Sequence, residues 1–484
     1  MVKRRHIGFG VLGIIPLTLF AQQAEKPNVL FIAVDDLNDW AACLGGYQGT
    51  IHTPNLDRLA SQGVLFTKAY CSVPSSAPSR ASVLTGISAP NSGMYLNEQH
   101  WRQVPALAEA ITIPEYFREN GYTVKGGGKI FHALSWLTHE LNYTGQVDGD
   151  NDPKCWDDYY PSLQRSMPDA ILPEEWQQNQ PSEGRPFPYF AWGALPDDRT
   201  EEMSDYRVVD WAISELQKPH DKPFFLGVGI YKPHIPWFVP QKYFDLYPLD
   251  SIVLPRVRPD DMTDLKSHRR EHWHQWILDN DLWTEAVQGY LASITFCDEQ
   301  VGRLLDALEK SGRAGNTIVV LWSDHGFHLG EKYNWEKFTL WEEATRVTFM
   351  LKAAGTESAK VETPVSLLDI YPTLNELCGF APKENLDGLS LVPQLTDPEA
   401  GIDRKVVMTW KYNCHAIRSD RYRYIRYDDG FEELYDHAVD PDEFVNLVYD
   451  TEGKQRYVAV LDEHRLALPV YNEPQGEVKY IIIE

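Results

Sequence analysis

Apolar runs that end in polar residues alternate along this chain with segments of helical periodicity. Continuous apolar stretches at 28–36, 223–234 and 317–326 are typical of buried strands, and each runs into charged side chains or histidine. Segments 52–63 and 297–312 repeat apolar residues every three or four positions, which predicts amphipathic helices. Strands alternating with helices predict an α/β fold, with a mostly parallel central sheet flanked by helices.

The pattern changes towards the C-terminus. After about residue 395, short strands alternate with turns, which predicts a small subdomain built on an antiparallel sheet. We therefore expect a large domain over 25–395 and a C-terminal subdomain over 396–484.

The first 21 residues predict a secretory signal peptide. Basic residues at 3–5 precede an apolar run at 7–20, and Ala21 offers a small residue for cleavage. A transmembrane anchor is the alternative, but the run is shorter than the about 20 apolar residues that a span needs. No later stretch is long and apolar enough to span. We expect an exported protein, in the periplasm or outside the cell, with no membrane span.

Composition and charge narrow the class of protein. The 484 residues are 43% hydrophobic, which suits a large globular core. The formal net charge of -25 argues against nucleic acid as a partner. An anionic substrate would need a local concentration of positive charge in its site. The six cysteines contain no C-x-x-C pair, so the sequence permits disulfides without predicting them.

Polar residues that follow the apolar strands are the candidate site residues. Ligands of α/β sheets gather at the carboxyl ends of strands, so these side chains should meet at one edge. They are Asp35, Asp36, Lys129, His132, His234, Asp324 and His325. Clustered carboxylates cannot all stay ionised without a cation, which favours Ca²⁺ or Mg²⁺. The alternative is that the aspartate pair only ends a strand.

Basic residues in separate segments supply candidate donors to a tetrahedral oxyanion. Arg80 offers a planar fork, and Lys129 and Lys337 offer point charges. The imidazoles of His132 and His234 titrate near neutrality, so they are candidates for a general acid and base. Taken singly, each of these side chains is as readily explained as a surface charge or a structural histidine.

The segment 71–86 crowds small hydroxyl residues around one arginine. Its part Ser-Ala-Pro-Ser-Arg-Ala-Ser-Val-Leu-Thr-Gly, starting at Ser76, resembles the signature of the type I sulfatases. That signature has Cys or Ser, any residue, Pro-Ser-Arg, and Leu-Thr-Gly at a fixed distance. The resemblance extends along the chain and is strongest to iduronate-2-sulfatase and its bacterial polysaccharide-sulfatase relatives, in segments 28–37, 52–66, 112–132, 232–249 and 323–337. It implies the alkaline phosphatase-like sulfatase fold.

The resemblance also implies a chemistry for Ser76. Sulfatases convert this position to formylglycine (3-oxoalanine), and the serine form implies a radical-SAM sulfatase-maturating enzyme as a partner. A plain serine would keep the sulfate as a stable ester, whereas an aldehyde hydrate has a second hydroxyl that expels it. By the same resemblance one Ca²⁺ per chain is held by modified Ser76 together with Asp35, Asp36, Asp324 and His325.

The remaining roles come from the same resemblance. Arg80 and Lys129 match residues that hold and polarise the hydrate, and Lys337 matches a lysine that contacts sulfate. His132 matches the base that breaks the sulfated intermediate. His234 matches the acid that protonates the leaving sugar oxygen.

The substrate class is a sulfated carbohydrate, either a glycosaminoglycan with a uronate 2-O-sulfate or an algal glycan such as ulvan. Candidate sugar contacts, for which packing is the alternative, are His328, Trp335, His415 and Arg418. Two other functions stay open. A phosphatase or phosphonate hydrolase of the same superfamily is disfavoured by the complete Pro-Ser-Arg signature. A non-catalytic glycan-binding protein would not need this set of acids, bases and cations.

Overall fold

The computed structural model describes most of the chain, namely residues 26–132, 152, 154–160, 180–187, 190–265, 271–401, 404–449 and 456–476. The signal peptide predicted at 1–21 lies outside these residues. Within the described part, none of the helices combines the length and the apolar composition required to cross a bilayer. All six cysteines are described, and all six are free.

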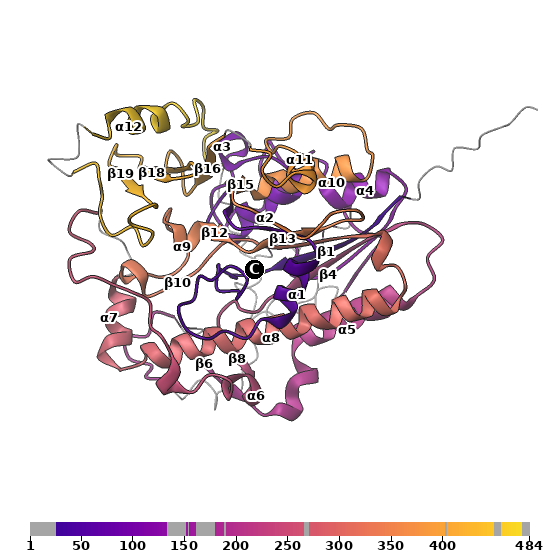
Figure 1. The fold of residues 1–484 in the computed structure, drawn as a ribbon, viewed down its shortest axis with the longest axis horizontal. Coiled ribbons are helices and arrows are strands. Elements are labelled where there is room, and N and C mark those ends of the chain that lie inside the picture. Colours follow the sequence, from indigo (N-terminus) through magenta and orange to yellow (C-terminus); the bar gives the residue numbers. More distant parts are fainter. Residues whose placement is uncertain are drawn as a thin grey trace, which may run out of the picture.

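An eight-stranded sheet with the order β14-β2-β13-β9-β1-β7-β4-β5 forms the centre of the molecule (Figure 1). Strand β1 (Asn28–Val34) pairs in parallel with β7 (Phe224–Ile230) on one side and with β9 (Thr317–Ser323) on the other. Beyond β7, parallel pairing continues through β4 (Thr123–Gly128) to β5 (Asp158–Tyr160). The mostly parallel sheet predicted from the apolar runs is confirmed.

The other side of the sheet contains its antiparallel pairing. Strand β13 (Phe349–Lys352) runs antiparallel to both β9 and β2 (Val64–Phe66), and β14 (Ala359–Val361) is parallel to β2. Five parallel strands therefore end together at one edge, which is where the site residues were expected.

Both faces of the sheet are covered, which explains why β1 is apolar at every position after Asn28. Leu30 and Ile32 point into one core, whereas Val29 and Phe31 point into the other. Side chains of a strand alternate between faces, so a strand buried on both sides has no polar positions.

Helices on each face complete the two cores. On one face lie α1 (Pro54–Gln62), α5 (Ser204–Gln217) and α8 (Trp283–Lys310), and on the other α2 (Ser76–Thr85), α4 (Ile113–Glu119) and α10 (Ile370–Leu377) (Figure 1). The helix predicted over 297–312 is only the C-terminal part of α8. Nearly every residue between 286 and 298 is buried, so that half of the helix lacks the polar face that makes helical periodicity visible.

Shorter elements connect these layers. They are β3 (Ala69–Tyr70), α3 (Ala89–Ser92), β6 (Trp192–Leu195), β8 (Trp237–Pro240), α6 (Gln241–Phe244), α7 (Glu271–Asp279), β10 (His328–Leu329), β11 (Trp335–Glu336), α9 (Glu342–Thr345), β12 (Arg346–Val347), β15 (Val365–Ser366) and α11 (Val392–Thr396).

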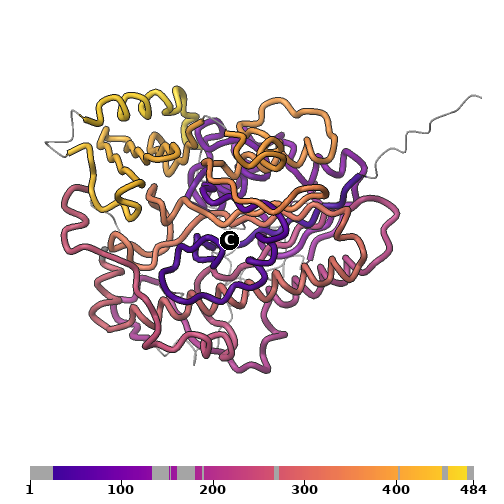
Figure 2. The backbone as a smooth tube through the Cα atoms, viewed as in Figure 1, coloured from indigo at the N-terminus to yellow at the C-terminus, as the bar shows by residue number. Residues whose placement is uncertain are grey.

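The C-terminal region forms an antiparallel sheet, as predicted. Strands β16 (Val406–Thr409), β17 (His415–Arg418), β18 (Tyr422–Arg426) and β19 (Glu432–Asp436) pair in sequence order, and α12 (Val458–Arg465) packs on them. Figure 2 shows this region at one end of the molecule, beside the segments that follow β9. The domain boundary at 395/396 stays a prediction.

Candidate active site

The candidate site lies where the parallel strands end. Asp35 and Asp36 follow β1, and Asp324 and His325 follow its neighbour β9. All four side chains are fully buried, and their ligand atoms lie within 4.8 Å of one another. Lys129 directly follows β4, two strands away from β1 in the same parallel set. The convergence predicted from the strand ends is therefore present.

Ser76 opens helix α2 and points to this cluster. Its Oγ lies 2.9 Å from His325 Nε2. The start of the helix is fixed by Asn97, whose Oδ1 accepts hydrogen bonds from the Ala77 amide and the Ser75 hydroxyl, both at 2.8 Å. The helix dipole adds a partial positive charge at Ser76, which favours negative charge on any group attached there.

Arg80 lies one turn further along α2 and ties three strand ends together. Its Nε donates to Asp324 Oδ2 at 2.8 Å, and its other nitrogens donate to the carbonyls of Val34, Lys129 and Ile130. The guanidinium is fully buried. In this structure Arg80 thus holds β1, β4 and β9 in register around the cluster.

Two lysines neutralise the aspartates after β1. Lys129 pairs with Asp35, and Lys337 Nζ donates to both carboxylate oxygens of Asp36, at 2.9 and 3.1 Å. Burial opposes ionisation of Asp35, yet Lys129 and the surrounding cations hold its pKa well below the usual value. Burial raises the pKa of Asp36 well above its usual value, assisted by Asp35 and Asp324 and opposed by Lys337.

Burial also acts on the histidines of the site. It lowers the pKa of His325 to about 4, so this imidazole is neutral at physiological pH, the form that binds metals. Burial, with help from Lys129, lowers the pKa of His132 well below its usual value. Burial and Lys337 do the same for His234, whose Nε2 lies 3.7 Å from Asp36 Oδ2.

The four residues Asp35, Asp36, Asp324 and His325 fit a calcium ion. They offer carboxylate oxygens, which Ca²⁺ prefers, and one neutral imidazole nitrogen. Asp35 Oδ1 is buried and has no hydrogen-bond partner. Its nearest cation is Arg80 Nη2 at 3.4 Å, so this buried oxygen keeps room for a further ligand bond to a metal ion.

The side chains of the four predicted sugar contacts are all buried in this structure. Trp335 is fully buried in the core, where its Nε1 donates to His274 Nδ1 at 3.2 Å. Arg418 is 2% exposed and pairs with Glu342, and His415 accepts or donates a 3.0 Å hydrogen bond with Thr409 on the neighbouring strand. In this structure these three side chains are buried in packing contacts, and their role as sugar contacts stays a prediction. His328 is buried, but it lines a separate cavity.

Three residues of the site escaped the analysis of the sequence. Tyr290 on α8 donates from its hydroxyl to the Asp36 carbonyl at 2.7 Å. Asp205 on α5 accepts the amides of Tyr231 and Lys232, both at 2.9 Å, and so fixes the loop that carries His234. The third is Asn97, described above. Each sits in a different segment with no motif around it, so only the fold reveals these contacts.

Two protein-family models match this chain. The family model described as "Sulfatase" matches residues 27–380. A second model, described as "N-sulphoglucosamine sulphohydrolase, C-terminal", matches residues 330–468. Together these two models span nearly all of the described chain.

Individual relatives extend the match over most of the chain. A protein named sulfatase from Formosa agariphila is 37% identical over 455 residues, which cover 91% of this chain and 86% of the relative. Iduronate 2-sulfatase from Homo sapiens is 32% identical, with 76% of this chain and 68% of the relative covered. An ulvan-active sulfatase from Formosa agariphila is 30% identical, with coverages of 91% and 80%.

A solved structure supports the fold. The phosphonate monoester hydrolase of Agrobacterium radiobacter superposes with a TM-score of 0.69, covering 91% of this chain and 95% of that one. Its sequence identity is 22%, so the likeness concerns the fold alone.

Proposed function

This chain belongs to the sulfatase family, has the alkaline phosphatase-like fold of that family and is a sulfuric ester hydrolase; from this premise we propose that it removes sulfate from sulfated carbohydrates with a formylglycine made from Ser76. The observation that carries the proposal is the position of Ser76. It opens α2 with its Oγ 2.9 Å from His325, beside three buried carboxylates and three buried cations.

The proposed reaction uses both hydroxyls of the hydrated aldehyde. One hydroxyl would form a bond to the sulfur atom as the bond from sulfur to the sugar oxygen breaks. The proton that this hydroxyl loses would be delivered to the sugar oxygen by His234, because burial keeps the pKa of this imidazole low and leaves it without a proton of its own to donate. The second hydroxyl would then give its proton to His132 as the bond between the hydrate carbon and the sulfated oxygen breaks, which would release sulfate and restore the aldehyde. Lys129 and Arg80 stabilise negative charge on the hydrate, and Lys337 does the same for the sulfate oxygens.

A calcium ion is part of the proposal. Asp35, Asp36, Asp324 and His325 would hold it, together with the modified Ser76 side chain. When bound, the ion supplies positive charge that polarises the sulfate ester and offsets the three carboxylates. This local charge is needed because the whole chain carries a formal charge of -25 and would otherwise repel a sulfated substrate.

Two substrate classes are compatible with the relatives. One relative is named for iduronate 2-sulfate and another for ulvan. These names support the two substrates proposed for this chain, a glycosaminoglycan with a uronate 2-O-sulfate and an algal glycan such as ulvan. A phosphatase or phosphonate hydrolase is not favoured, because that likeness rests on the fold alone.

Export and maturation complete the proposal. The basic and apolar segments within 1–21 support export by a signal peptide, to the periplasm or beyond. Pro78 and Arg80 in the Ser-type signature support a radical-SAM maturase as the enzyme that modifies Ser76 before export.

The first experiment is the mass of the peptide that contains residues 71–80. The protein is produced together with a radical-SAM maturase, with a maturase-free preparation as the control. We expect Ser76 to lose two hydrogens only in the first preparation. An unmodified serine in both would contradict the formylglycine proposal.

Activity is then measured as sulfate released from uronate 2-O-sulfated oligosaccharides and ulvan fragments. Ser76→Ala should abolish turnover and leave the fold intact, because Ser76 is the first residue of α2 and alanine suits a helix. Undiminished sulfate release from Ser76→Ala would refute the assignment of the nucleophile.

A further inference from the structure

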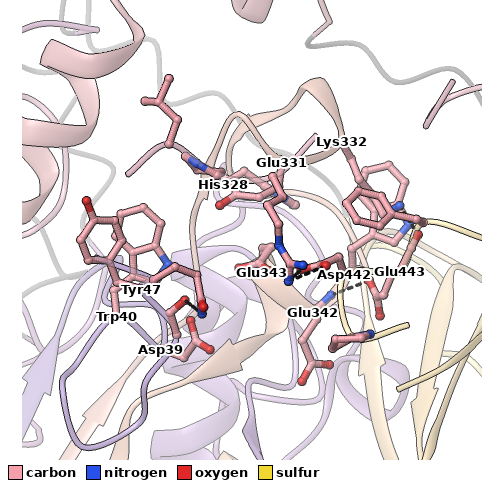
Figure 3. Close-up of a pocket in the computed structure, with 18 of the residues that line it drawn as sticks. Asp39, Trp40, Tyr47, His328, Glu331, Lys332, Glu342, Glu343, Asp442 and Glu443 are labelled. Carbon is pink, nitrogen blue, oxygen red and sulfur yellow. Dashed lines mark hydrogen bonds and ion pairs between the residues drawn. The ribbon is translucent and has the colours of Figure 1, made fainter. Parts of the chain in front are cut away.

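The structure contains a cavity outside the candidate active site (Figure 3). Its volume is about 330 Å³, the size of a small-molecule site. Its walls come from the loop after β1, residues 253–256, the stretch from β10 to α9, and residues 441–444. Among the described residues that line it are His328 and Asp39, each three positions after a member of the metal cluster, but none of the proposed catalytic residues.

Acidic and aromatic side chains dominate the walls. Trp40 and Tyr47 lie together on one side, and Lys332 and Glu443 lie on the other (Figure 3). Two cations, Lys332 and Arg256, line the cavity, against seven carboxylates: Asp39, Asp261, Glu331, Glu342, Glu343, Asp442 and Glu443.

Most of these carboxylates are paired with cations around the cavity. Arg346 pairs with Asp39 at 2.9 Å, Arg256 with Asp442 at 2.7 Å, and Lys332 with Asp261 at 3.2 Å. Glu342 and Glu443 share the buried Arg423.

Glu331 and Glu343 are different. Within the described part of the chain neither forms an ion pair with a cation within 4.0 Å, although Arg346 acts on Glu343 from further away. Glu331 accepts the Leu329 amide at 2.6 Å and its own amide. Burial raises the pKa of Glu331 to about 7. Burial, with Glu331 and Asp39 as neighbours, raises the pKa of Glu343 well above its usual value. Two carboxylates that line one cavity without a direct ion pair either take up protons or are stabilised by a cation that enters the cavity.

A second observation points the same way. Asp261 lines the cavity and is only 1% exposed, and its Oδ2 is buried without a hydrogen-bond partner. Its other oxygen is satisfied by Lys332. A buried acceptor of this kind is normally paired, so this lining residue still has an oxygen free to accept a hydrogen bond.

The spacing of the acids decides what kind of cation fits. Among the described residues, three or more metal-type ligands converge within 4.8 Å at the catalytic cluster and at Glu342, His437 and Glu443. Arg423 already occupies the second group, and Glu331, Glu343 and Asp261 belong to neither. These acids are spread around a space far larger than an ion and flanked by aromatic rings, which attract organic cations.

We propose that this cavity binds a protonated organic amine, whose ammonium group pairs with Glu343 and Glu331 and whose body packs between Trp40, Tyr47 and Trp341. Two sources offer this chemistry, an amino sugar with a free amino group and an aliphatic polyamine. The site is separate from sulfate ester hydrolysis, so the proposal stands or falls independently of the substrate and of formylglycine.

Binding is measured by titration calorimetry at neutral pH on the full chain loaded with Ca²⁺. The probes are glucosamine, N-acetylglucosamine as its uncharged counterpart, and spermidine. We expect one site per chain for glucosamine or for spermidine, and the probe that binds identifies the source. N-acetylglucosamine should bind at least about tenfold more weakly than glucosamine, because it lacks the charge that pairs with the carboxylates.

Matched variants locate the site. Glu343→Gln keeps the shape of the side chain and should weaken amine binding at least about tenfold. Glu309→Gln removes an equally negative but exposed side chain at the end of α8 and should leave binding unchanged. Glu331→Gln serves as a second cavity variant if Glu343→Gln does not fold.

Several outcomes would overturn the proposal. They are no saturable binding of either amine, equal binding of glucosamine and N-acetylglucosamine where glucosamine is the amine that binds, or full affinity in the folded cavity variants.

Discussion

At the scale of single residues, Arg80 has the widest reach in the site. Its guanidinium contacts Asp324 and the carbonyls at the ends of β1 and β4, and it is fully buried. A lysine has one nitrogen and no planar fork, so it cannot reach these acceptors together. The residue therefore serves the architecture of the site as well as its charge.

We predict that Arg80→Lys lowers the free energy of unfolding by about 2 kcal/mol or more, because buried acceptors lose their donors. The matched control is Arg58→Lys, whose arginine pairs with Asp306 at the surface and should change stability by less than about 1 kcal/mol. Urea unfolding of both variants checks this. Equal effects of the two substitutions would contradict the role given to Arg80.

At the scale of elements, the close packing of β4 and β7 places Lys129. Gly229 on β7 lies so close to Lys129 that an added Cβ would meet its backbone at 2.2 Å. The two strands pair in parallel up to this point, at Gly128 and Gly229. The glycine is thus required by contact between strands, and not by a turn.

Gly229→Ala is predicted to lower the free energy of unfolding by about 1–3 kcal/mol through overpacking, and to reduce sulfate release because Lys129 shifts. Gly315→Ala is the control, since an added Cβ there meets nothing within 4 Å. Its effect should be within about 1 kcal/mol and stabilising. Unfolding curves and turnover of both variants test this, and an unchanged Gly229→Ala enzyme would refute it.

Helix α12 is attached to the C-terminal sheet by a charged pair. Arg465 on the helix donates from Nε to Glu432 Oε1 on β19 at 2.8 Å, and a second bond joins Nη2 to Oε2. This hydrogen bonding lowers the pKa of Glu432 below the ordinary value of 4.5. The stabilising effect is therefore present above pH 4.5 and is lost as pH falls through the lowered folded-state pKa.

The expected result is a loss of amide-exchange protection in α12 below pH 4.5, after correction for intrinsic exchange rates. Arg465→Gln should reduce protection already above that pH and remove this pH dependence. The same acid-induced loss in wild type and variant would show that another group controls the helix.

At the scale of the whole molecule, charge is distributed unevenly. The chain carries a formal charge of -25, whereas Asp35, Asp36 and Asp324 meet Arg80, Lys129 and Lys337 in the site. A bound divalent cation would make this region locally positive. The net negative charge of the chain would repel an anionic substrate, so the cations gathered in the site would favour its binding there.

We predict that a chelator lowers the melting temperature and that added Ca²⁺ restores it, because a ligand that binds only the folded state stabilises it. Asp36→Asn removes one carboxylate ligand and should abolish most of the Ca²⁺ response. Differential scanning calorimetry measures both without any need for activity. If neither the chelator nor added Ca²⁺ changes the melting temperature of the wild-type protein, the calcium site is contradicted.

Part of this protein is determined locally and was therefore predictable. The buried strands at 28–36 and 317–326, the parallel sheet and the convergence of Asp35, Asp36, Asp324 and His325 follow from short-range patterns. The carboxyl ends of parallel strands must share an edge, so the prediction of a parallel sheet was enough to place these residues at that edge. The antiparallel C-terminal sheet was also predictable, because short strands separated by turns pair with their neighbours in the sequence.

Other features depend on contacts between distant segments, and only the tertiary structure decided them. Trp335 and Arg418 are residue types that often contact sugars. In this structure Trp335 is buried in the core, and Arg418 is buried in an ion pair with Glu342. The support of the site by Tyr290 and Asp205 joins helices to loops far away in sequence. A side chain's type and spacing determine what it is able to do, whereas its partners depend on which segments the fold brings within hydrogen-bond distance.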